Sequence, residues 1–260
     1  MIQLKKKILL KNKVLILVAV RLKSARLPKK AIEDLYGEPL VIRLTERVRK
    51  AEMPDDLIWC TSTNSQDDPL EELALKHGIT CFRGSELDVM SRFIQIADQE
   101  NASIVVRITG DNPLTDPVMM DTMIKAHLKK KAEYTYTDDL PVGTRPEIIN
   151  VKMLKRCHKL LQDPNASEYM TWMLNRPEHF KTLQFLVPDQ KLKRPEISLT
   201  VDTENDLDVV REIYEKFEGD PPVLQHIISW LDLNPELINK NDNPSEATIP
   251  EAVNYKLVID

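Results

Sequence analysis

The chain has 260 residues, enough for one large α/β domain or two small ones, and we expect one domain over residues 1–233 followed by a tail over 234–260. A formal net charge of -5, with 30% charged residues, gives no overall attraction for nucleic acid or for an anionic membrane. The three cysteines are odd in number and lack metal-ligand spacing, which is typical of reduced thiols in a cytoplasmic protein. The composition therefore excludes a disulfide scaffold and favours a cytoplasmic globular protein.

The N-terminal segment combines a basic start with an apolar run, as a signal peptide does. The apolar run over 14–20 has only seven residues, ends on Arg21 and is not followed by a small-residue cleavage site. Elsewhere no stretch approaches the ~18 apolar residues that a membrane span needs. We interpret the run as a core strand.

The first half of the chain alternates strands with helices. The continuous β-branched run over 14–20 indicates a central strand that is buried on both faces of a parallel sheet. A polar loop leads from it to a helix over 38–51, in which apolar residues recur at helical spacing. Further strands are expected at 57–61, 79–82 and 103–108, and helices at 69–77 and 87–99. Such alternation predicts an α/β fold with a right-handed, doubly wound sheet.

The second half predicts a mixed sheet, because shorter strands and paired helices replace the regular alternation. Its strands are expected at 133–137, 147–151, 182–187 and 196–201. Its helices are expected at 117–130, 152–161, 167–175, 204–217 and 223–231. From Asn234 onward the composition turns to Asn, Pro and Glu, which is typical of a peripheral or mobile tail.

A dense basic segment follows the first strand. The sequence RLKSARLPKK, over residues 21–30, holds five cations and one serine hydroxyl. A basic run is usually a solvated surface, but in an open parallel sheet the loop after the first strand is the usual phosphate-binding loop. Five cations there are able to neutralise a triphosphate. We therefore interpret residues 21–30 as a triphosphate clamp.

Two aspartates follow later strands. Asp111 lies in a Gly-Asp-Asn-Pro turn after the 103–108 strand, at the same rim of the sheet as the basic loop. There its carboxylate is placed to hold Mg²⁺ against phosphate oxygens, although Asp in such a turn also commonly caps its own backbone. Asp202 ends the 196–201 strand and is a candidate second metal ligand. The assignment of Asp202 depends on that of Asp111 and of the basic loop.

Other polar residues have simpler explanations. Asp116 precedes Pro117 and is expected to cap a helix, and Thr203 with Asp206 is expected to begin the next one. The five histidines have no paired ligand spacing, so packing or surface positions are favoured over catalysis. The sequence has no Ser-His-Asp or Cys-His pattern.

These segments together carry a family resemblance. The run R-x-x-S-x-R-L-P-x-K, read at Arg21, Ser24, Arg26, Pro28 and Lys30, resembles the signature of the bacterial sugar cytidylyltransferases, which include the CMP-sialic acid and CMP-ketodeoxyoctonate synthetases. Within that family the chain is most similar to the spore coat polysaccharide biosynthesis protein F branch. The similarity continues collinearly through TSTNSQDDP, FRGSELDVMSRF, VVRITGDNPLTDP and TVDTENDL. It spans about residues 14–217, and several collinear motifs are far more specific than one.

The resemblance implies a Rossmann-like nucleotide-diphospho-sugar transferase fold, CTP as donor, Mg²⁺ as cofactor and often a homodimer. It implies that the triphosphate is bound by Arg21, Ser24, Arg26 and Lys30. It implies that the metal is held by Asp111 and Asp202. It places beside the nucleotide Arg83, Asp88 and Arg92, and on the acceptor side Glu147 and Glu168. Among these, the catalytic candidates are Arg21, Arg26, Lys30 and Asp111.

The chain also departs from the family pattern. Lys23 and Lys29 stand where the family often has glycine, which lets backbone amides approach phosphate or adopt a positive φ. Around Gly143 the relatives usually carry an acidic-Gly-x-Asp pattern, which this chain lacks, and Glu168 begins Glu-Tyr-Met-Thr in place of Glu-His-Val-Thr. Both changes fall in the expected acceptor pocket. There Arg145 binds an acceptor carboxylate or phosphate, or it is a plain surface residue.

The resulting hypothesis is that an acceptor hydroxyl attacks the α-phosphate of CTP, releases pyrophosphate and leaves a CMP-linked sugar or sugar acid. Two alternatives stay open. One is a glycosyltransferase or another pyrophosphorylase of similar fold, for which the weak Asp-x-Asp candidate is residues 137–139. The other is a non-catalytic nucleotide-binding relative, which the altered acceptor loop would suit.

Overall fold

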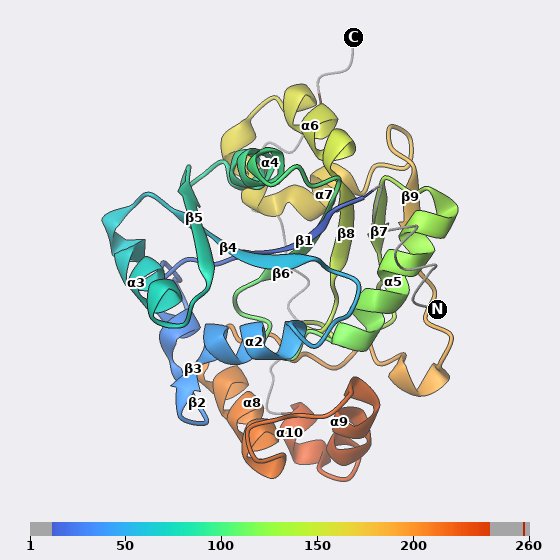
Figure 1. The fold of residues 1–260 in the computed structure, drawn as a ribbon. Coiled ribbons are helices and arrows are strands. Elements are labelled where there is room, and N and C mark those ends of the chain that lie inside the picture. Colours follow the sequence, from blue (N-terminus) through green and yellow to red (C-terminus); the bar gives the residue numbers. More distant parts are fainter. Residues whose placement is uncertain (1–11, 240–256, 258–260) are drawn as a thin grey trace.

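A seven-stranded sheet forms the centre of the fold (Figure 1). The structure is a computed structural model that describes residues 12–239 and 257. The strands follow the order β5-β4-β1-β6-β8-β7-β9. Their bounds are β1 (Val14–Ala19), β4 (Asp56–Ser62), β5 (Thr80–Gly84), β6 (Ile104–Thr109), β7 (Tyr134–Tyr136), β8 (Glu147–Asn150) and β9 (Thr182–Gln184). Strand β8 runs antiparallel to β6 and β7, and the other pairings of this sheet are parallel. The predicted, mostly parallel sheet with a mixed second part is confirmed.

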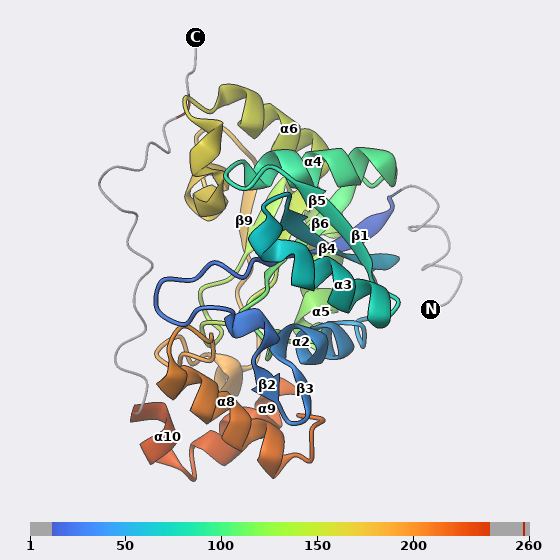
Figure 2. The same ribbon diagram turned by 90° about the vertical axis from the view of Figure 1, so that its left-hand side faces the viewer.

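Helices cover both faces of the sheet, so the fold is doubly wound as predicted (Figures 1 and 2). One face is covered by α4 (Val89–Gln99), α6 (Val151–Leu160) and α7 (Met170–Leu174). The opposite face is covered by α2 (Leu40–Val48), α3 (Asp68–Lys76) and α5 (Pro117–Lys130). On the same side, beyond these helices, lie α8 (Glu204–Lys216), α9 (Leu224–Leu231) and α10 (Pro235–Asn239). We call these the α4 face and the α2 face.

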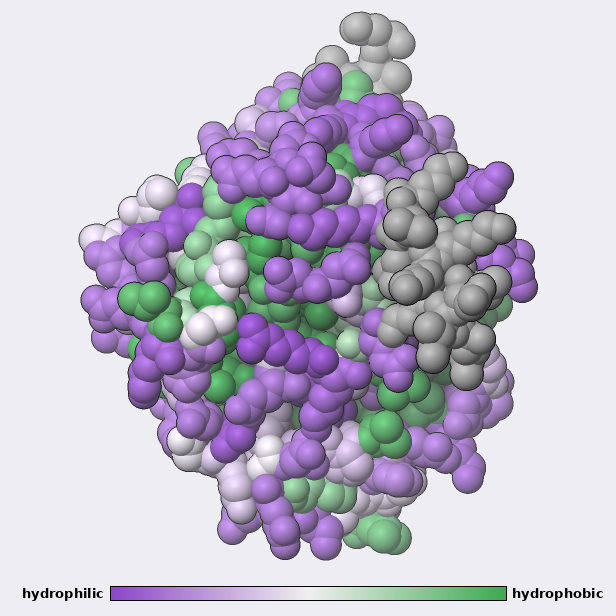
Figure 3. All heavy atoms as spheres, viewed as in Figure 1, coloured by the Kyte–Doolittle hydropathy of each residue, from purple (hydrophilic) through white to green (hydrophobic). Residues whose placement is uncertain are grey.

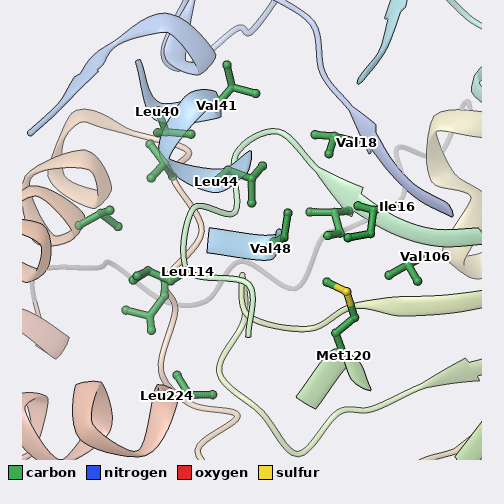
Figure 4. Packing of buried hydrophobic residues seen from close by; sticks show 14 of the residues in the cluster. Ile16, Val18, Leu40, Val41, Leu44, Val48, Val106, Leu114, Met120 and Leu224 are labelled. Atoms are coloured by element: carbon green, nitrogen blue, oxygen red, sulfur yellow. The ribbon is translucent and has the colours of Figure 1, made fainter. Parts of the chain in front are cut away.

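Alternate residues of the central strands build two separate cores, because successive strand side chains point to opposite faces. On the α2 face, Ile16, Val18 and Val106 pack with Leu44 and Met120, as Figure 4 shows. Leu15 and Leu17 of β1 and Val105 of β6 point to the other face and join the core under α4 and α6. This two-sided burial explains why the strand over 14–20 reads as an unbroken apolar run.

The predicted strand over 196–201 is wrong. This segment makes only an isolated bridge, between Val142 and Ser198, and its apolar residues are buried in the α2-face core without joining the sheet. Its backbone pairs with irregular neighbours instead: Leu199 N donates to Val142 O at 2.8 Å, and Val201 N donates to Asp111 O at 2.9 Å. The apolar alternation therefore reflects one-sided burial of an extended segment rather than a sheet strand.

Two helix predictions have different bounds in the structure. The helix expected from residue 38 begins at Leu40, because a hairpin of β2 (Asp34–Leu35) and β3 (Glu38–Pro39) precedes it. Tyr36 and Gly37 form its two-residue turn with φ values of 57° and 80°, the left-handed conformation that such tight hairpins need. The helix expected over 167–175 is a 3₁₀ helix, η3 (Pro164–Tyr169), followed by α7.

The predicted helix caps are confirmed. Asp116 accepts a hydrogen bond from Met119 N at 2.7 Å at the start of α5. Thr203 and Asp206 form a reciprocal capping box at the start of α8.

The predicted tail lies mostly outside the described residues. Its first part forms α10, whose Leu237 is buried in the α2-face core. The division into a 1–233 domain and a tail stays a prediction. The face seen in Figure 3 is mainly hydrophilic, with apolar areas between the polar side chains. Across the described part of the chain, no helix combines the length and apolar character needed to cross a bilayer.

The buried His127 of α5 predicts a pH-dependent stability. Its Nδ1 lies 2.9 Å from Thr135 Oγ1, and burial lowers the pKa of His127 to about 4. The unfolded chain therefore binds a proton between pH ~6.5 and ~4 that the folded chain does not, and the free energy of unfolding falls as pH falls through this window. Over this pH range we expect the unfolding free energy of His127→Gln to fall by roughly 2 to 3 kcal/mol less than that of the unchanged protein. Urea unfolding at several pH values measures this difference. The matched control is His226→Gln, at an exposed histidine, which should keep the slope of the unchanged protein.

Candidate nucleotide site

A cavity of ≈ 440 Å³ lies beyond the carboxyl ends of β1 and β6. This edge is where open α/β sheets bind ligands. Five separate segments form its wall: the loop after β1, the start of α4, the end of β6 with the two residues after it, the end of η3, and Asp202. The polar side chains in the wall are Arg21, Lys23, Ser24, Arg26, Lys30, Arg92, Arg107, Thr109, Asp111, Glu168, Tyr169 and Asp202. Six of them are basic and three are acidic, so the cavity favours anions.

The basic loop is fixed at both ends. At its start, Leu22 N donates to the buried carboxylate of Asp67 at 2.8 Å, and Ser62 Oγ donates to the other oxygen of that carboxylate. At its end, Lys29 N donates to Leu22 O at 3.0 Å. Lys29 itself has a φ of 61°, the left-handed conformation that favours glycine. A lysine therefore adopts the left-handed backbone conformation at residue 29.

Lys30 joins three parts of the site. Its ammonium donates to Asp111 Oδ2, Asp202 Oδ1 and Val201 O, each at 2.8 Å. These three bonds use all three N–H donors of the ammonium. Only 12% of the Lys30 side chain is exposed, and the two carboxylates are about one quarter exposed. The two aspartates that the sequence predicts as metal ligands are therefore neighbours, held by one shared cation.

This bridge shifts the pKa values of Asp111 and Lys30. Burial alone would raise the pKa of Asp111, but the charge of Lys30 and its hydrogen bond outweigh burial, so the pKa lies below its ordinary value. Burial alone would lower the pKa of Lys30, and the two carboxylates reverse that effect, so its pKa lies above its ordinary value. Both groups are thus charged at neutral pH.

The other clamp cations are also paired. Arg26 Nη2 lies 2.9 Å from Asp202 Oδ2, and Arg21 Nη2 lies 2.8 Å from Glu168 Oε2. Ser24 Oγ accepts a hydrogen bond from Leu27 N at 3.4 Å and so shapes the loop. These exposed arginine pairs are weak in water, so phosphate oxygens compete with the carboxylates for both guanidinium groups.

Glu147 lies behind the cavity wall rather than in it. It is buried and accepts hydrogen bonds from Arg107, Tyr134 and Thr171, the last at 2.9 Å. Burial alone would lower the pKa of Arg107, but the charge and hydrogen bond of Glu147 raise it above its ordinary value. Glu147 therefore holds Arg107, which itself lines the cavity.

Three further residues that the sequence places near the substrates do not line this cavity. Arg83 donates to two backbone carbonyl groups, of Ser62 and Asn64, and pairs with two carboxylates of the β4–α3 region. Asp88 caps α4 and lies 2.7 Å from His158 Nε2. Arg145 donates to Leu140 O at 2.6 Å, and burial lowers its pKa. Their substrate roles stay predictions.

The weak Asp-x-Asp candidate is occupied by structural contacts. Asp138 Oδ2 accepts a hydrogen bond from Gln184 Nε2 at 3.0 Å, and Asp139 Oδ2 accepts one from Val187 N at 2.8 Å. Neither aspartate lines the cavity. The geometry gives no support to a glycosyltransferase metal site at these residues.

Sequence reasoning assigned no role to Arg107, Tyr169 or Asp67. Arg107 opens the RITGDNPLTDP motif and is a charged residue within a buried strand, and that unusual position was the available signal. Asp67 lies in the TSTNSQDDP motif, but its contact with the basic loop joins residues 45 positions apart. Such a contact has no local sequence pattern.

The aspartate pair suits a divalent cation. Asp111 and Asp202 present carboxylate oxygens around one point of positive charge, and hard cations prefer oxygen ligands. Within the described residues no group of three His, Cys, Asp or Glu side chains could enclose a metal ion alone. Mg²⁺ commonly binds through one or two carboxylates together with substrate phosphates, so the pair fits that mode.

Together, the sheet, its basic first loop and the facing aspartates define an α/β nucleotidyltransferase. The sequence profile described as Cytidylyltransferase matches residues 15–216, and the chain belongs to this family of CTP-dependent nucleotidyltransferases. The chain is 32% identical to the spore coat polysaccharide biosynthesis protein SpsF of Bacillus subtilis over 238 residues, which cover 89% of this chain and 99% of that protein. The predicted family and its SpsF branch are therefore confirmed.

Solved structures agree with this assignment. A cytidylyltransferase from Leptospira borgpetersenii superposes with a TM-score of 0.81 and 26% identity, covering 92% of this chain and 99% of that chain. The CMP:2-keto-3-deoxy-manno-octonic acid synthetase, solved in complex with CTP, superposes with a TM-score of 0.63 and 16% identity, covering 79% of this chain and 99% of that chain. The second likeness bears on the fold alone.

Removing the shared cation provides a test of the site that needs no activity. In Lys30→Met the two carboxylates repel each other without compensation, and we expect a loss of about 2 to 4 kcal/mol in unfolding free energy. Millimolar Mg²⁺ should raise the melting temperature of this variant more than that of the unchanged protein, because the ion neutralises the pair in place of the ammonium. The control is Lys50→Met, which removes an exposed lysine paired with Asp220. An equal effect of Mg²⁺ on all three proteins would contradict the site.

Proposed function

We propose that the protein transfers CMP from CTP to a hydroxyl of a sugar or sugar acid, with release of pyrophosphate, in the biosynthesis of a surface polysaccharide or glycoconjugate. The observation that carries this proposal is the Lys30 bridge between Asp111 and Asp202, which lies in the cavity beside Arg26. The membership in the cytidylyltransferase family and the name of the SpsF relative support the nucleotide and the pathway class.

The clamp residues bind and orient the triphosphate. Arg21 and Arg26 exchange their carboxylate partners for phosphate oxygens, to which guanidinium groups bind in a forked geometry. Lys30 contributes a fixed positive charge beside them. As pyrophosphate departs, these charges stabilise the negative charge that develops on it, and because they are already positioned, they need little reorganisation.

Mg²⁺ is part of the proposal, with Asp111 and Asp202 as its protein ligands. When bound, Mg²⁺ polarises the phosphate and favours ionisation of the acceptor hydroxyl. The bridge holds the two carboxylates close together before any ligand arrives, because Lys30 compensates their charge. No histidine lines the described cavity, so activation of the hydroxyl by an imidazole finds no support.

The bond changes are those of an in-line displacement. The acceptor oxygen forms a bond to the α-phosphorus, the bond from that phosphorus to the bridging oxygen breaks, and the acceptor proton passes to solvent. The protein needs no covalent intermediate. We place the reaction in the cytoplasm and expect a homodimer, which sedimentation of the purified chain would test.

The test is pyrophosphate release from each of the four nucleoside triphosphates with Mg²⁺ and a panel of sugars, sugar acids and phosphorylated polyols. We expect release with CTP and not with the other three nucleotides. Asp111→Asn and Asp202→Asn should each lower kcat/KM by at least about 100-fold, because each loses a charge that acts on the transition state. Release with a different nucleotide would favour another pyrophosphorylase. CTP binding that Asp111→Ala leaves unchanged, with no release from any acceptor, would favour a non-catalytic relative.

A further inference from the structure

Seven exposed cations lie together on the surface formed by the end of α5, the residue before β9 and the outer side of α6. We call this set the basic surface. The whole chain has a formal net charge of -5, so the basic surface gathers charge of the opposite sign in one place. Its members are Lys129, Lys130, Lys131, Lys152, Arg156, Lys159 and Lys181.

Contacts at Glu133 join the three segments of the basic surface. Arg156 Nη1 and Nη2 donate to the two oxygens of Glu133 at 2.9 and 3.1 Å, and Lys181 N donates to the second oxygen at 2.9 Å. Lys181 Nζ donates to Lys130 O at 2.8 Å, which places the end of α5 beside the start of β9. The hydrogen bonds from Arg156 are the main reason why the pKa of Glu133 is lowered. Glu133 therefore offsets one of the seven positive charges.

The basic surface continues along α6. Lys152 lies one turn before Arg156 and Lys159 lies about one turn after it, so the three side chains share one side of the helix. The neighbouring Lys155 is different, because it pairs with Asp98 of α4. Within the described part of the chain, the six lysines of the basic surface have no carboxylate partner. Their charges are therefore available to an external partner.

The basic surface begins at the edge of the sheet opposite the cavity. Strand β8 runs antiparallel to β6 and β7, so β7 has the direction of β6, and β9 has the direction of β7. The amino ends of β7 and β9 and the start of α6 therefore lie away from the carboxyl ends of β1 and β6, where the cavity is. None of the seven cations lines the described cavity. A partner on the basic surface would leave the cavity open.

Carboxylates at the same edge lie elsewhere along the sheet. Asp55 and Asp56 are at the start of β4, which β1, β6 and β8 separate from β7. Asp55 is also occupied, since its Oδ2 accepts a hydrogen bond from Val14 N at 2.8 Å. The positive charge of the basic surface is therefore not neutralised by these two carboxylates.

The chemistry of the basic surface favours a bilayer that carries anionic lipids. Six of its seven cations are lysines, whose compact and strongly hydrated charges are attracted to a charged lipid surface without a fixed geometry. The one arginine, Arg156, is held by Glu133, and its Cζ lies 5.1 Å from the ring centroid of the buried Phe180. Proteins that bind nucleic acids instead use free arginine forks and exposed aromatic rings. A second copy of this chain would bring like charges together.

We propose that the basic surface binds the protein peripherally to a membrane surface that carries anionic lipids, with the nucleotide cavity left open to solution. The attraction is electrostatic, and each lysine strengthens binding about fivefold, which corresponds to about 1 kcal/mol. The proposal does not rest on the proposed function, because its residues lie outside the cavity.

The test is sedimentation of the full chain with lipid vesicles. We expect binding to vesicles of phosphatidylcholine mixed with phosphatidylglycerol, and no binding to vesicles of phosphatidylcholine alone. Added sodium chloride should weaken the binding, because salt screens the attraction between exposed charges. The same assay with polyuridylic acid or polyglutamate as a competitor distinguishes lipid from other polyanions.

A triple variant tests the residues. Lys130→Gln, Lys131→Gln and Lys152→Gln together remove three exposed charges that have no carboxylate partner within the described part of the chain. At about fivefold for each lysine, binding to the anionic vesicles should weaken by about 100-fold. The melting temperature and the release of pyrophosphate from CTP should stay those of the unchanged protein, because the three side chains lie on the surface away from the cavity.

The matched control removes the same number of charges elsewhere. Lys76→Gln, Lys191→Gln and Lys216→Gln change exposed lysines of α3, of the segment after β9 and of α8. The net charge changes by the same amount as in the first triple variant. Binding of the control to the anionic vesicles should stay within about threefold of that of the unchanged protein, since its substitutions lie outside the basic surface.

Three results would overturn the membrane surface. One is equal binding by the two triple variants, which would assign any binding to other lysines, such as those over residues 5–7. Another is binding to phosphatidylcholine alone as tight as binding to the anionic vesicles. The third is binding of polyuridylic acid or polyglutamate without binding of the vesicles. Failure of the proposed function has a different signature, because a protein that binds vesicles and releases no pyrophosphate from CTP still has the membrane surface.

Discussion

The three hydrogen bonds of the Lys30 ammonium are the interaction on which the site depends. They connect the basic loop after β1 to the turn after β6 and to the segment before α8, which lie 81 and more residues apart in the sequence. Without a cation at this point, Asp111 and Asp202 would repel each other and the three segments would separate. The same contact therefore stabilises the fold and holds the two carboxylates together at the cavity.

Several residues around this contact have conformations or burial that lower the stability of the fold. Lys29 adopts a left-handed conformation that costs a non-glycine residue about 1 kcal/mol or more. Arg92 lies buried, and two of its donor atoms have no hydrogen-bond partner within the described part of the chain. Asp67 is buried so that its carboxylate can hold the start of the basic loop. Each feature is typical of a site whose residues are placed for a ligand at some expense of stability.

Much of the fold and part of the site could be predicted from the sequence, and the limits have physical reasons. Strands buried on both faces read as unbroken apolar runs, and the carboxyl ends of parallel strands share one edge, so the convergence of Lys30 with Asp111 follows from their positions after β1 and β6. The segment over 196–201 has a strand-like pattern because one side is buried, although it joins no sheet. The Arg107–Glu147 pair depends on an antiparallel register that no local pattern specifies.

The central claim is that Asp111 and Asp202 form a metal site. The Lys30 ammonium neutralises their charge until CTP and the ion bind. The most direct measurement is a crystal structure of the protein with CTP and Mn²⁺, in which anomalous scattering locates the ion. The account predicts an anomalous peak between the two carboxylates, with the Lys30 ammonium turned toward a phosphate oxygen. A peak elsewhere, with the three Lys30 hydrogen bonds intact in the presence of bound CTP, would contradict it.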